Sequence, residues 1–133
     1  MSERKDMAAA QALPGSGRRT VFVRDLELVV SIGVLAHEKR YEQRVLISVE
    51  LVVHDAYDGK SDRLEHVLDY SQLIEGITLL VQGEHFNLLE TMAERVAQHC
   101  LADSRCESVR VRIEKPDIMP SCRSVGVEIE RRR

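Results

Sequence analysis

The sequence predicts a two-layer α+β domain in which two helices cover one face of an antiparallel four-stranded sheet. Two observations carry this fold class. Four segments alternate apolar and polar residues with period two, which is typical of half-buried strands. Two central segments carry apolar stripes with helical spacing instead. The order is therefore ββααββ, and two amphipathic helices can supply the cover that four half-buried strands need.

The first two predicted strands lie between residues 21 and 53. In the first strand, Val21 and Val23 are out of phase with the alternating run that starts at Leu26, so we expect a bulge at Arg24–Asp25. The second strand alternates cleanly, and the two should form an antiparallel pair. The alternating apolar positions are Leu26, Leu28, Val30 and Ile32, followed by Val45, Ile47, Val49, Leu51 and Val53.

Two helices follow a long connection over residues 54–68, which shows no sustained period. Asp69 is placed to cap the first helix, and Gly83 to end it. The second helix should begin near Asn87, which with Glu90 has the form of a capping box. The predicted buried stripes are Leu73, Ile74, Ile77, Leu80 and Val81 in the first helix, and Leu89, Met92, Ala93, Val96, Ala97 and Cys100 in the second.

The last two strands enclose a loop with two prolines. Pro116 lacks an amide N–H, so regular pairing should stop there and leave Lys115 at the rim of the sheet. A lysine held at a strand end is well placed for chemistry, although the spacing alone favours a solvated lysine beside a turn. We expect the apolar positions of both strands to be largely buried: Val109, Val111, Ile113, Val125, Val127 and Ile129.

Length and composition limit the possible classes of protein. The 133 residues suit one domain, with 1–20 as a disordered leader and 21–133 as the folded part. A net charge of −3 argues against a nucleic-acid-binding protein. No apolar run reaches membrane-spanning length, no secretory signal is evident, and three cysteines without CxxC spacing suit a reducing compartment. We therefore expect a soluble cytoplasmic protein without membrane or nucleic-acid partners.

The edges of so small an open sheet should pair with another chain, which predicts a homo-oligomer.

The sequence lacks several common site motifs. The five histidines form no HxH or HExxH pair, so no metal site is expected. Neither a phosphate-binding glycine loop nor a GxSxG motif is present. Cys100 falls on a predicted core face, and Cys106 and Cys122 have no evident activating partner.

Three further residues are candidates for a site with Lys115, although each has an ordinary structural explanation. Glu38 taken alone reads as a surface glutamate in a loop. Tyr70 reads as a half-buried aromatic at a helix start. Glu90 reads as the acidic partner of the capping box, where the helix dipole also favours a negative charge.

Taken together, these residues lie in segments that resemble one known family. The segments are IGVLAHE (32–38) with Gln43, VLDYSQLI (67–74), NLLETMAERVA (87–97) and KPDIMPSCRSVGVEIER (115–131). They are similar to the dihydroneopterin aldolase family, which includes epimerase relatives, and the resemblance spans residues 21–131. It implies the tunnelling fold, in which subunits join their sheets into a barrel, here a tetramer or octamer with sites between subunits.

The resemblance implies a retro-aldol cleavage of 7,8-dihydroneopterin in folate biosynthesis, without metal or other cofactor. The products are 6-hydroxymethyl-7,8-dihydropterin and glycolaldehyde, and the C=N bond of the pterin ring accepts the electrons. By the same resemblance, Glu90 holds the pterin amino and ring N–H groups, and the Leu89 backbone contacts the ring. Lys115 is the acid–base residue, Tyr70 reaches in from a neighbouring subunit, and Glu38 lies near the substrate side chain.

Departures from the family pattern leave two alternatives open. His37 stands where members with a similar segment often carry tryptophan, and Arg123 adds a charge after Lys115. Lys39, Arg40 and Arg44 are either solvated or favour a phosphorylated side chain, which would suit an epimerase acting on dihydroneopterin or its triphosphate. A non-catalytic pterin-binding assembly protein is the alternative from another class.

Overall fold

A computed structural model describes residues 17–133, and the strands and helices follow the predicted order. They are β1 (Arg18–Val30), β2 (Gln43–His54), the short 3-10 helix η1 (Leu64–His66), α2 (Tyr70–Gln82), α3 (Leu89–Leu101), β3 (Cys106–Lys115) and β4 (Val125–Arg132). Residues 1–16 of the predicted leader lie outside the described part. Residues 18–20, also assigned to the leader, are instead the beginning of β1.

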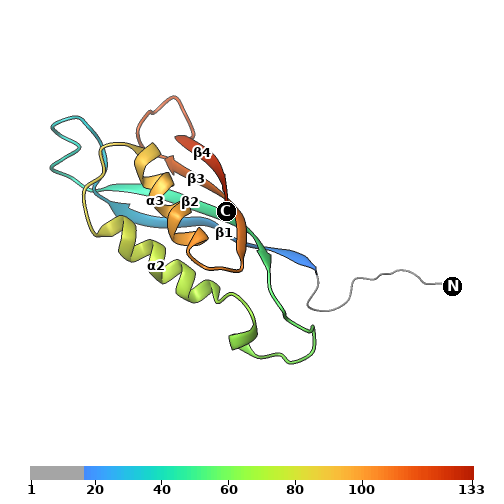
Figure 1. Cartoon of the computed structure of the whole chain (residues 1–133). Helices are drawn as coiled ribbons and strands as arrows, with labels where there is room; N and C mark the ends of the chain where they lie inside the picture. Colours follow the sequence, from blue (N-terminus) through green and yellow to red (C-terminus); the bar gives the residue numbers. More distant parts are fainter. Residues whose placement is uncertain (1–16) are drawn as a thin grey trace.

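The four strands form one antiparallel sheet in the order β1-β2-β3-β4. Both helices lie on the same face of it, as Figure 1 shows. Helix α2 packs beside β1, whereas α3 packs over β3 and β4. The predicted two-layer α+β architecture is therefore confirmed.

The predicted bulge in β1 is present. The register against β2 shifts between Val23 and Leu26, and Asp25 adopts a φ of 57°. The Asp25 backbone N–H donates to the hydroxyl of Ser48 at 2.9 Å, which satisfies an amide that the bulge removes from the ladder. The bulge brings both halves of the strand into phase with the core.

The core lies between the sheet and the helices and is built from the predicted aliphatic stripes. Among the fully buried side chains are Val30, Ile32, Val45, Ile47, Leu51, Ile77, Met92, Val96, Val111 and Ile113. Burial of β4 is the exception to the prediction. Val127 and Ile129 are only partly buried, and Val125 is 37% exposed, because β4 is an edge strand that α3 covers incompletely.

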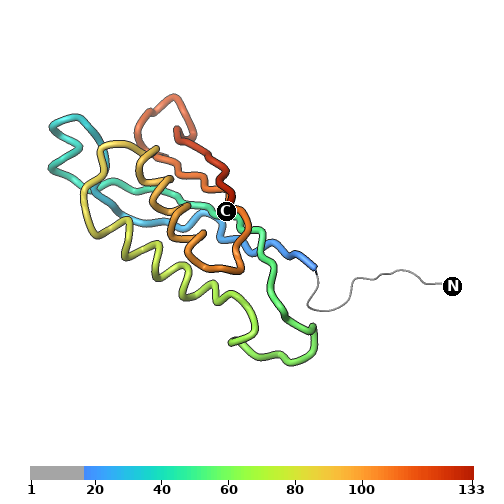
Figure 2. The backbone as a smooth tube through the Cα atoms, in the orientation of Figure 1, coloured from blue at the N-terminus to red at the C-terminus, as the bar shows by residue number. Residues whose placement is uncertain are grey.

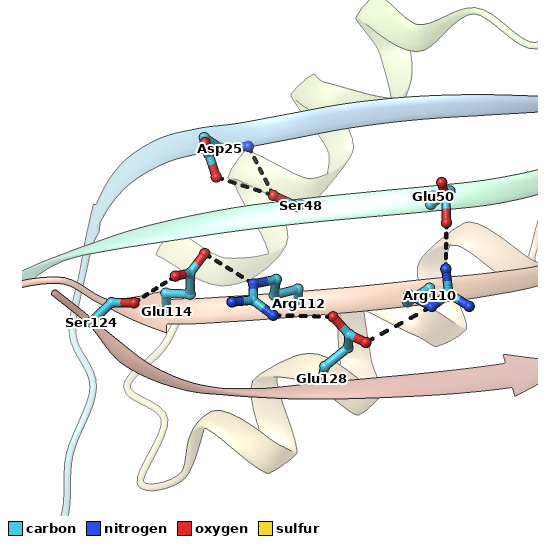
Figure 3. Close-up of polar contacts among 8 residues, drawn as sticks. All are labelled: Asp25, Ser48, Glu50, Arg110, Arg112, Glu114, Ser124 and Glu128. Atoms are coloured by element: carbon cyan, nitrogen blue, oxygen red, sulfur yellow. Dashed lines mark hydrogen bonds and ion pairs between the residues drawn. The ribbon is translucent and has the colours of Figure 1, made fainter. Parts of the chain in front are cut away.

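The opposite face of the sheet carries charged and polar side chains, as Figure 3 shows. Arg110 donates to Glu50 at 2.6 Å, and Arg112 donates to Glu114 and Glu128 at 3.2 and 3.3 Å. These ion pairs join β2, β3 and β4 across the sheet. Exposed pairs of this kind contribute little stability each, so the helix-covered face is the one that holds the fold together.

The helix ends agree only in part with the sequence prediction. Asp69 caps α2 by accepting from the N–H groups of Ser71 and Gln72, and Gly83 follows its last turn. The predicted capping box is wrong. Helix α3 begins at Leu89, its N-cap is Leu88, and no side chain caps it, so Asn87 and Glu90 do not form the reciprocal pair.

Candidate active site

A buried ion pair joins the end of β3 to the connection between β1 and β2. Lys115 is the last residue of β3, and its Nζ donates to Oε2 of Glu38 at 3.1 Å. The two side chains are only 12% and 7% exposed. Glu38 is thus not the surface glutamate that its loop position suggests.

The Glu38 carboxylate accepts two further hydrogen bonds. The side-chain amide of Gln43 donates to Oε2 at 3.1 Å, and the Leu35 N–H donates to Oε1 at 3.2 Å. Burial alone would raise the pKa of this carboxyl. The bonds from Gln43, Leu35 and Lys115 outweigh burial and hold the pKa at about 2, so Glu38 is a permanent anion near neutral pH.

The turn after β1 is shaped to hold Glu38 in this place. Gly33 has a φ of +132°, and a Cβ there would lie 2.2 Å from Cδ of Glu38. A side chain at Gly33 would therefore be strained and would also collide with the carboxylate. Gln43 fixes the other side, because its amide also donates to the Ile32 carbonyl at 2.7 Å.

The start of α3 lies against the same turn. Phe86 pairs with Ile32 in an isolated parallel bridge, and the Gly33 N–H donates to the Phe86 carbonyl at 2.9 Å. Leu89, partly buried, and Glu90, exposed, follow in the first turn of the helix. The exposed Glu90 carboxylate is thus carried on the element adjacent to the Glu38 turn.

Tyr70 does not join these residues within one chain. It is the first residue of α2 and is 62% exposed, not half-buried as expected. The last residue of α2, Gln82, donates to the Val29 carbonyl and so lies beside the Glu38 turn. Twelve helical steps separate Gln82 from Tyr70, about 18 Å along the axis, and Figure 2 shows the start of α2 at the far end of the molecule.

The cations near the site are not all available to a ligand. Arg44 donates to both carboxylate oxygens of Asp117, at 3.2 and 3.0 Å, and also contacts Glu27 at 3.4 Å. The Arg44 guanidinium lowers the pKa of the Asp117 carboxyl. This pair ties the loop after Lys115 to the start of β2.

Two residues that support the site were not among the predicted site residues. Gln43 appeared only as part of a segment, and its two hydrogen bonds depend on the turn it closes. His85 contacts Ser31 and Gly33, yet a single histidine between two helices has no distinguishing spacing.

The thiol of Cys100 does not contribute a nucleophile to this region. Cys100 is buried, and burial raises the pKa of its thiol to about 12, which agrees with its predicted core position. Within residues 17–133, no group of three or more histidine, cysteine or acidic side chains is arranged to hold a metal ion. In the same range, neither helix is long and apolar enough to cross a membrane.

A shallow hollow lies on the uncovered face of the sheet, away from this pair. It measures about 260 Å³ and is bounded by β1–β4 side chains that include Phe22, Ser48, Arg110 and Glu128, but neither Glu38 nor Lys115. In this hollow, Arg110 is already paired with Glu50, and Arg112 with Glu128.

The fold and this pair define a class: a small α+β protein with a buried acid–lysine pair on the rim of a helix-covered sheet. Comparison with known proteins gives the family. The family model described as "FolB: Dihydroneopterin aldolase" matches residues 21–130. The dihydroneopterin aldolase of Escherichia coli K12 is 33% identical over 111 residues, which cover 84% of this chain and 91% of that protein.

Solved structures agree. A dihydroneopterin aldolase structure from Vibrio cholerae superposes with a TM-score of 0.81 at 32% identity, covering 86% of this chain and 98% of that one. The E. coli enzyme in complex with neopterin gives a TM-score of 0.77 at 33% identity, covering 85% and 98%. A Burkholderia enzyme bound to guanine gives 0.76 at 34% identity, covering 87% and 92%.

The chain belongs to the dihydroneopterin aldolase family. Its reaction is the carbon–carbon lyase step of folate biosynthesis, in which 7,8-dihydroneopterin is cleaved.

Proposed function

We propose that this chain cleaves 7,8-dihydroneopterin with Lys115 as the acid–base residue, Glu90 as the pterin anchor and Tyr70 as a contribution from a neighbouring subunit. The buried Glu38–Lys115 pair carries this proposal, because it is a fixed lysine amine beside a permanent carboxylate at the end of a strand. The remaining roles are assigned around that pair.

Recognition of the pterin ring is assigned to the first turn of α3. The 2-amino group and adjacent ring N–H form a pair of donors, and an ionised carboxylate offers two acceptor oxygens to match them. Glu90 is exposed at the start of the helix and available for such a contact, and the backbone of Leu89 lies beside it. The related structures with neopterin and with guanine support this role, because both ligands carry the same amino-pyrimidinone edge.

The substrate side chain has three hydroxyl-bearing carbons, and the bond that breaks joins the inner carbon C1′, attached to the ring, to the middle carbon C2′. The C2′ hydroxyl loses its proton and becomes the aldehyde of glycolaldehyde, while the bond electrons move into the C=N of the dihydropterin ring. The enol-type intermediate then takes a proton at the inner carbon and gives 6-hydroxymethyl-7,8-dihydropterin. The ring is the electron sink, so the lysine need not form an imine.

Lys115 is assigned the proton transfers at the C2′ hydroxyl. Lys115 takes this proton as the neutral amine, whose lone pair accepts it directly or through a bridging water, while an N–H of the amine still donates to Glu38. Glu38 orients the amine and faces the polar side chain of the substrate. Tyr70 is assigned to protonation of the intermediate.

A closed homo-oligomer, tetramer or octamer, follows from this assignment. In the folded subunit, Tyr70 lies at the end of the molecule that is remote from Lys115. One subunit therefore cannot supply both side chains to one ligand. Both outer strands of the sheet, β1 and β4, have a free edge in the single chain, and β4 is only partly covered by α3. Pairing of such edges between subunits would bring the start of α2 of one chain to the Lys115 of another.

The substrate is expected to be the free alcohol in preference to the triphosphate. Arg44, one of the cations that suggested a phosphorylated side chain, already makes a bidentate pair with Asp117 and contacts Glu27. A phosphate would have to compete with two carboxylates for this guanidinium.

The deciding experiment is incubation of the purified protein with 7,8-dihydroneopterin and, separately, with its triphosphate, followed by chromatography of the products. We expect 6-hydroxymethyl-7,8-dihydropterin from the free alcohol. Interconversion of side-chain stereoisomers without cleavage would identify an epimerase instead. Tight binding of the pterin with neither product would identify a binding protein.

A further inference from the structure

His85 bridges the segment before α3 to the turn after β1. It is partly buried, its Nδ1 contacts the Ser31 hydroxyl at 2.5 Å, and its Nε2 contacts the Gly33 carbonyl at 2.9 Å. A carbonyl oxygen only accepts, so Nε2 carries the hydrogen and donates. In the neutral ring, Nδ1 then accepts from the Ser31 hydroxyl. Both ring nitrogens thus have a hydrogen-bond partner in the turn after β1.

The backbone contact between these segments is short. The Gly33 N–H donates to the Phe86 carbonyl at 2.9 Å, and the Phe86 N–H donates to the Ser31 carbonyl at 3.0 Å. These two bonds form an isolated parallel bridge, centred on Ile32 and Phe86, and no longer ladder extends it. The His85 side chain doubles the number of hydrogen bonds across this junction, which makes it a principal constraint on the relative position of the two segments.

One side of the junction holds the acid–base pair. Gly33 lies directly beneath Glu38, where even a methyl group would come within 2.2 Å of the carboxylate carbon. Glu38 in turn holds Lys115. A shift of the Gly33 carbonyl therefore moves the partner of the lysine.

The other side of the junction holds the start of α3. Because no side chain caps this helix, its first turn relies on the preceding segment for its position. Arg95 of α3 binds back to that segment, with an ion pair to Glu84 at 3.2 Å and its guanidinium 5.6 Å from the Phe86 ring centre. Glu90 is therefore placed by the same junction that His85 closes.

We propose that His85 is a positioning residue that sets the distance between the pterin anchor at the start of α3 and the Glu38–Lys115 pair. The inference rests on the function proposed above, in which these two groups hold opposite ends of one substrate. His85 itself need not touch the substrate. Its effect is to keep the scissile bond aligned with the lysine once Glu90 holds the ring.

The first test is His85→Ala, measured in single-turnover cleavage of 7,8-dihydroneopterin and in equilibrium binding of neopterin. Misalignment of about 1 Å can slow a reaction by about a hundredfold, so we expect cleavage to slow between about 10- and 100-fold. Neopterin affinity should change less than about threefold, because Glu90 and the Leu89 backbone remain. His54→Ala, at the exposed end of β2, is the matched control and should match the parent.

Two conservative variants separate positioning from general destabilisation. Gln at 85 can donate to the Gly33 carbonyl as Nε2 does, whereas Asn at 85 can only replace Nδ1 as the acceptor for Ser31. His85→Gln should recover most of the cleavage rate and His85→Asn should not, because the carbonyl of buried Gly33 otherwise loses its side-chain donor. Ser31→Ala leaves that bond intact and should keep a rate near that of the parent.

The proposal is overturned if His85→Ala cleaves at the parent rate. It is also overturned if the Ala, Gln and Asn variants lose rate equally and in proportion to their loss of thermal stability, since that marks a purely structural residue. Failure of the proposed function gives a different result: the parent itself then produces no 6-hydroxymethyl-7,8-dihydropterin.

Discussion

At the scale of single residues, the central feature of the site is the Glu38 carboxylate, which accepts hydrogen bonds from three donors. Glu38 is buried, yet it stays charged because Lys115, Gln43 and the Leu35 amide all point at it. A buried pair of this kind is a poor device for stability, since removing either partner leaves an uncompensated charge. Its value lies in fixing the lysine amine at a defined point.

Lys115→Ala should remove proton transfer while leaving the anchoring carboxylate of Glu90 unchanged. General acid–base catalysis typically contributes about 10²–10⁴-fold, so single-turnover cleavage should slow by that order, with pterin binding much less affected. Lys115→Arg should restore little, because a guanidinium does not release its proton in this pH range. The exposed Lys60→Ala is the control, and a parent-like rate for Lys115→Ala would falsify the role assigned to this lysine.

Glu38 should leave a signature in the pH dependence of stability. Its pKa is lowered in the folded state from the ordinary 4.5 to about 2, so the ionised form stabilises the fold. That contribution is complete above about pH 5 and is lost as the pH falls towards 2. The difference in unfolding free energy between parent and Glu38→Gln, from urea titrations, should therefore shrink over this window.

The exposed Glu42→Gln variant is the control for that titration and should follow the parent at each pH. A parent–Glu38→Gln difference that stays constant from pH 6 to about pH 2 would show that the carboxyl does not gain its stability from ionisation.

At the scale of elements, the start of α3 is the feature that the sequence describes least well. The segment before the helix leaves the chain extended at Leu88, and the segment is held by Phe86 and His85 rather than by a capping side chain. Glu90 therefore has no structural role in capping α3. Its carboxylate is exposed in the first turn, where the helix dipole favours a negative charge.

Glu90→Gln should weaken pterin binding without weakening the helix. The amide replaces one acceptor oxygen with a donor, which opposes the paired donors of the ring, and we expect an affinity loss of about 30- to 1,000-fold. Titration calorimetry with neopterin measures the affinity, and thermal unfolding measures the helix. Unchanged affinity together with a lowered Tm would restore the capping-box interpretation and contradict the anchoring role.

At the scale of the whole molecule, the proposed site requires Tyr70 and Lys115 to come from different subunits. In one folded subunit, Tyr70 and Lys115 lie at opposite ends of the molecule. A site formed between subunits therefore predicts that two inactive variants can complement each other. Co-expressed Lys115→Ala and Tyr70→Phe chains should recover activity, because about one site in four then combines an intact lysine with an intact tyrosine. Steady-state cleavage by the purified mixture is the measurement.

The matched control is a mixture of Lys115→Ala with Glu38→Gln chains. These residues contact each other within one chain at 3.1 Å, so no arrangement of subunits repairs a site and no activity should return. Absence of recovery in the tyrosine mixture would place the site within a single subunit. Recovery in the control mixture would contradict the action of Lys115 and Glu38 from the same chain. Light scattering that gave a monomer at micromolar concentration would exclude the assembly altogether.

The sequence by itself determined the order of elements, the bulge in β1, the cap at Asp69 and the buried faces of the strands and helices, with edge strand β4 buried less than predicted. These features depend on residues close together in the chain. The periodicity of apolar residues and the residue types that form local hydrogen bonds can therefore be recognised in the sequence. It also placed Lys115 at a strand end, because the proline after it stops pairing.

Only the tertiary structure decided that Glu38 is buried, that Gln43 and His85 support it, and that α3 begins without a cap. Glu38 and Lys115 are 77 positions apart, and their contact exists only once β1, β2 and β3 are paired. The same folding separates Tyr70 from them by the length of α2. Contacts between distant segments leave no period in the sequence, because the geometry of the packed sheet and helices creates them.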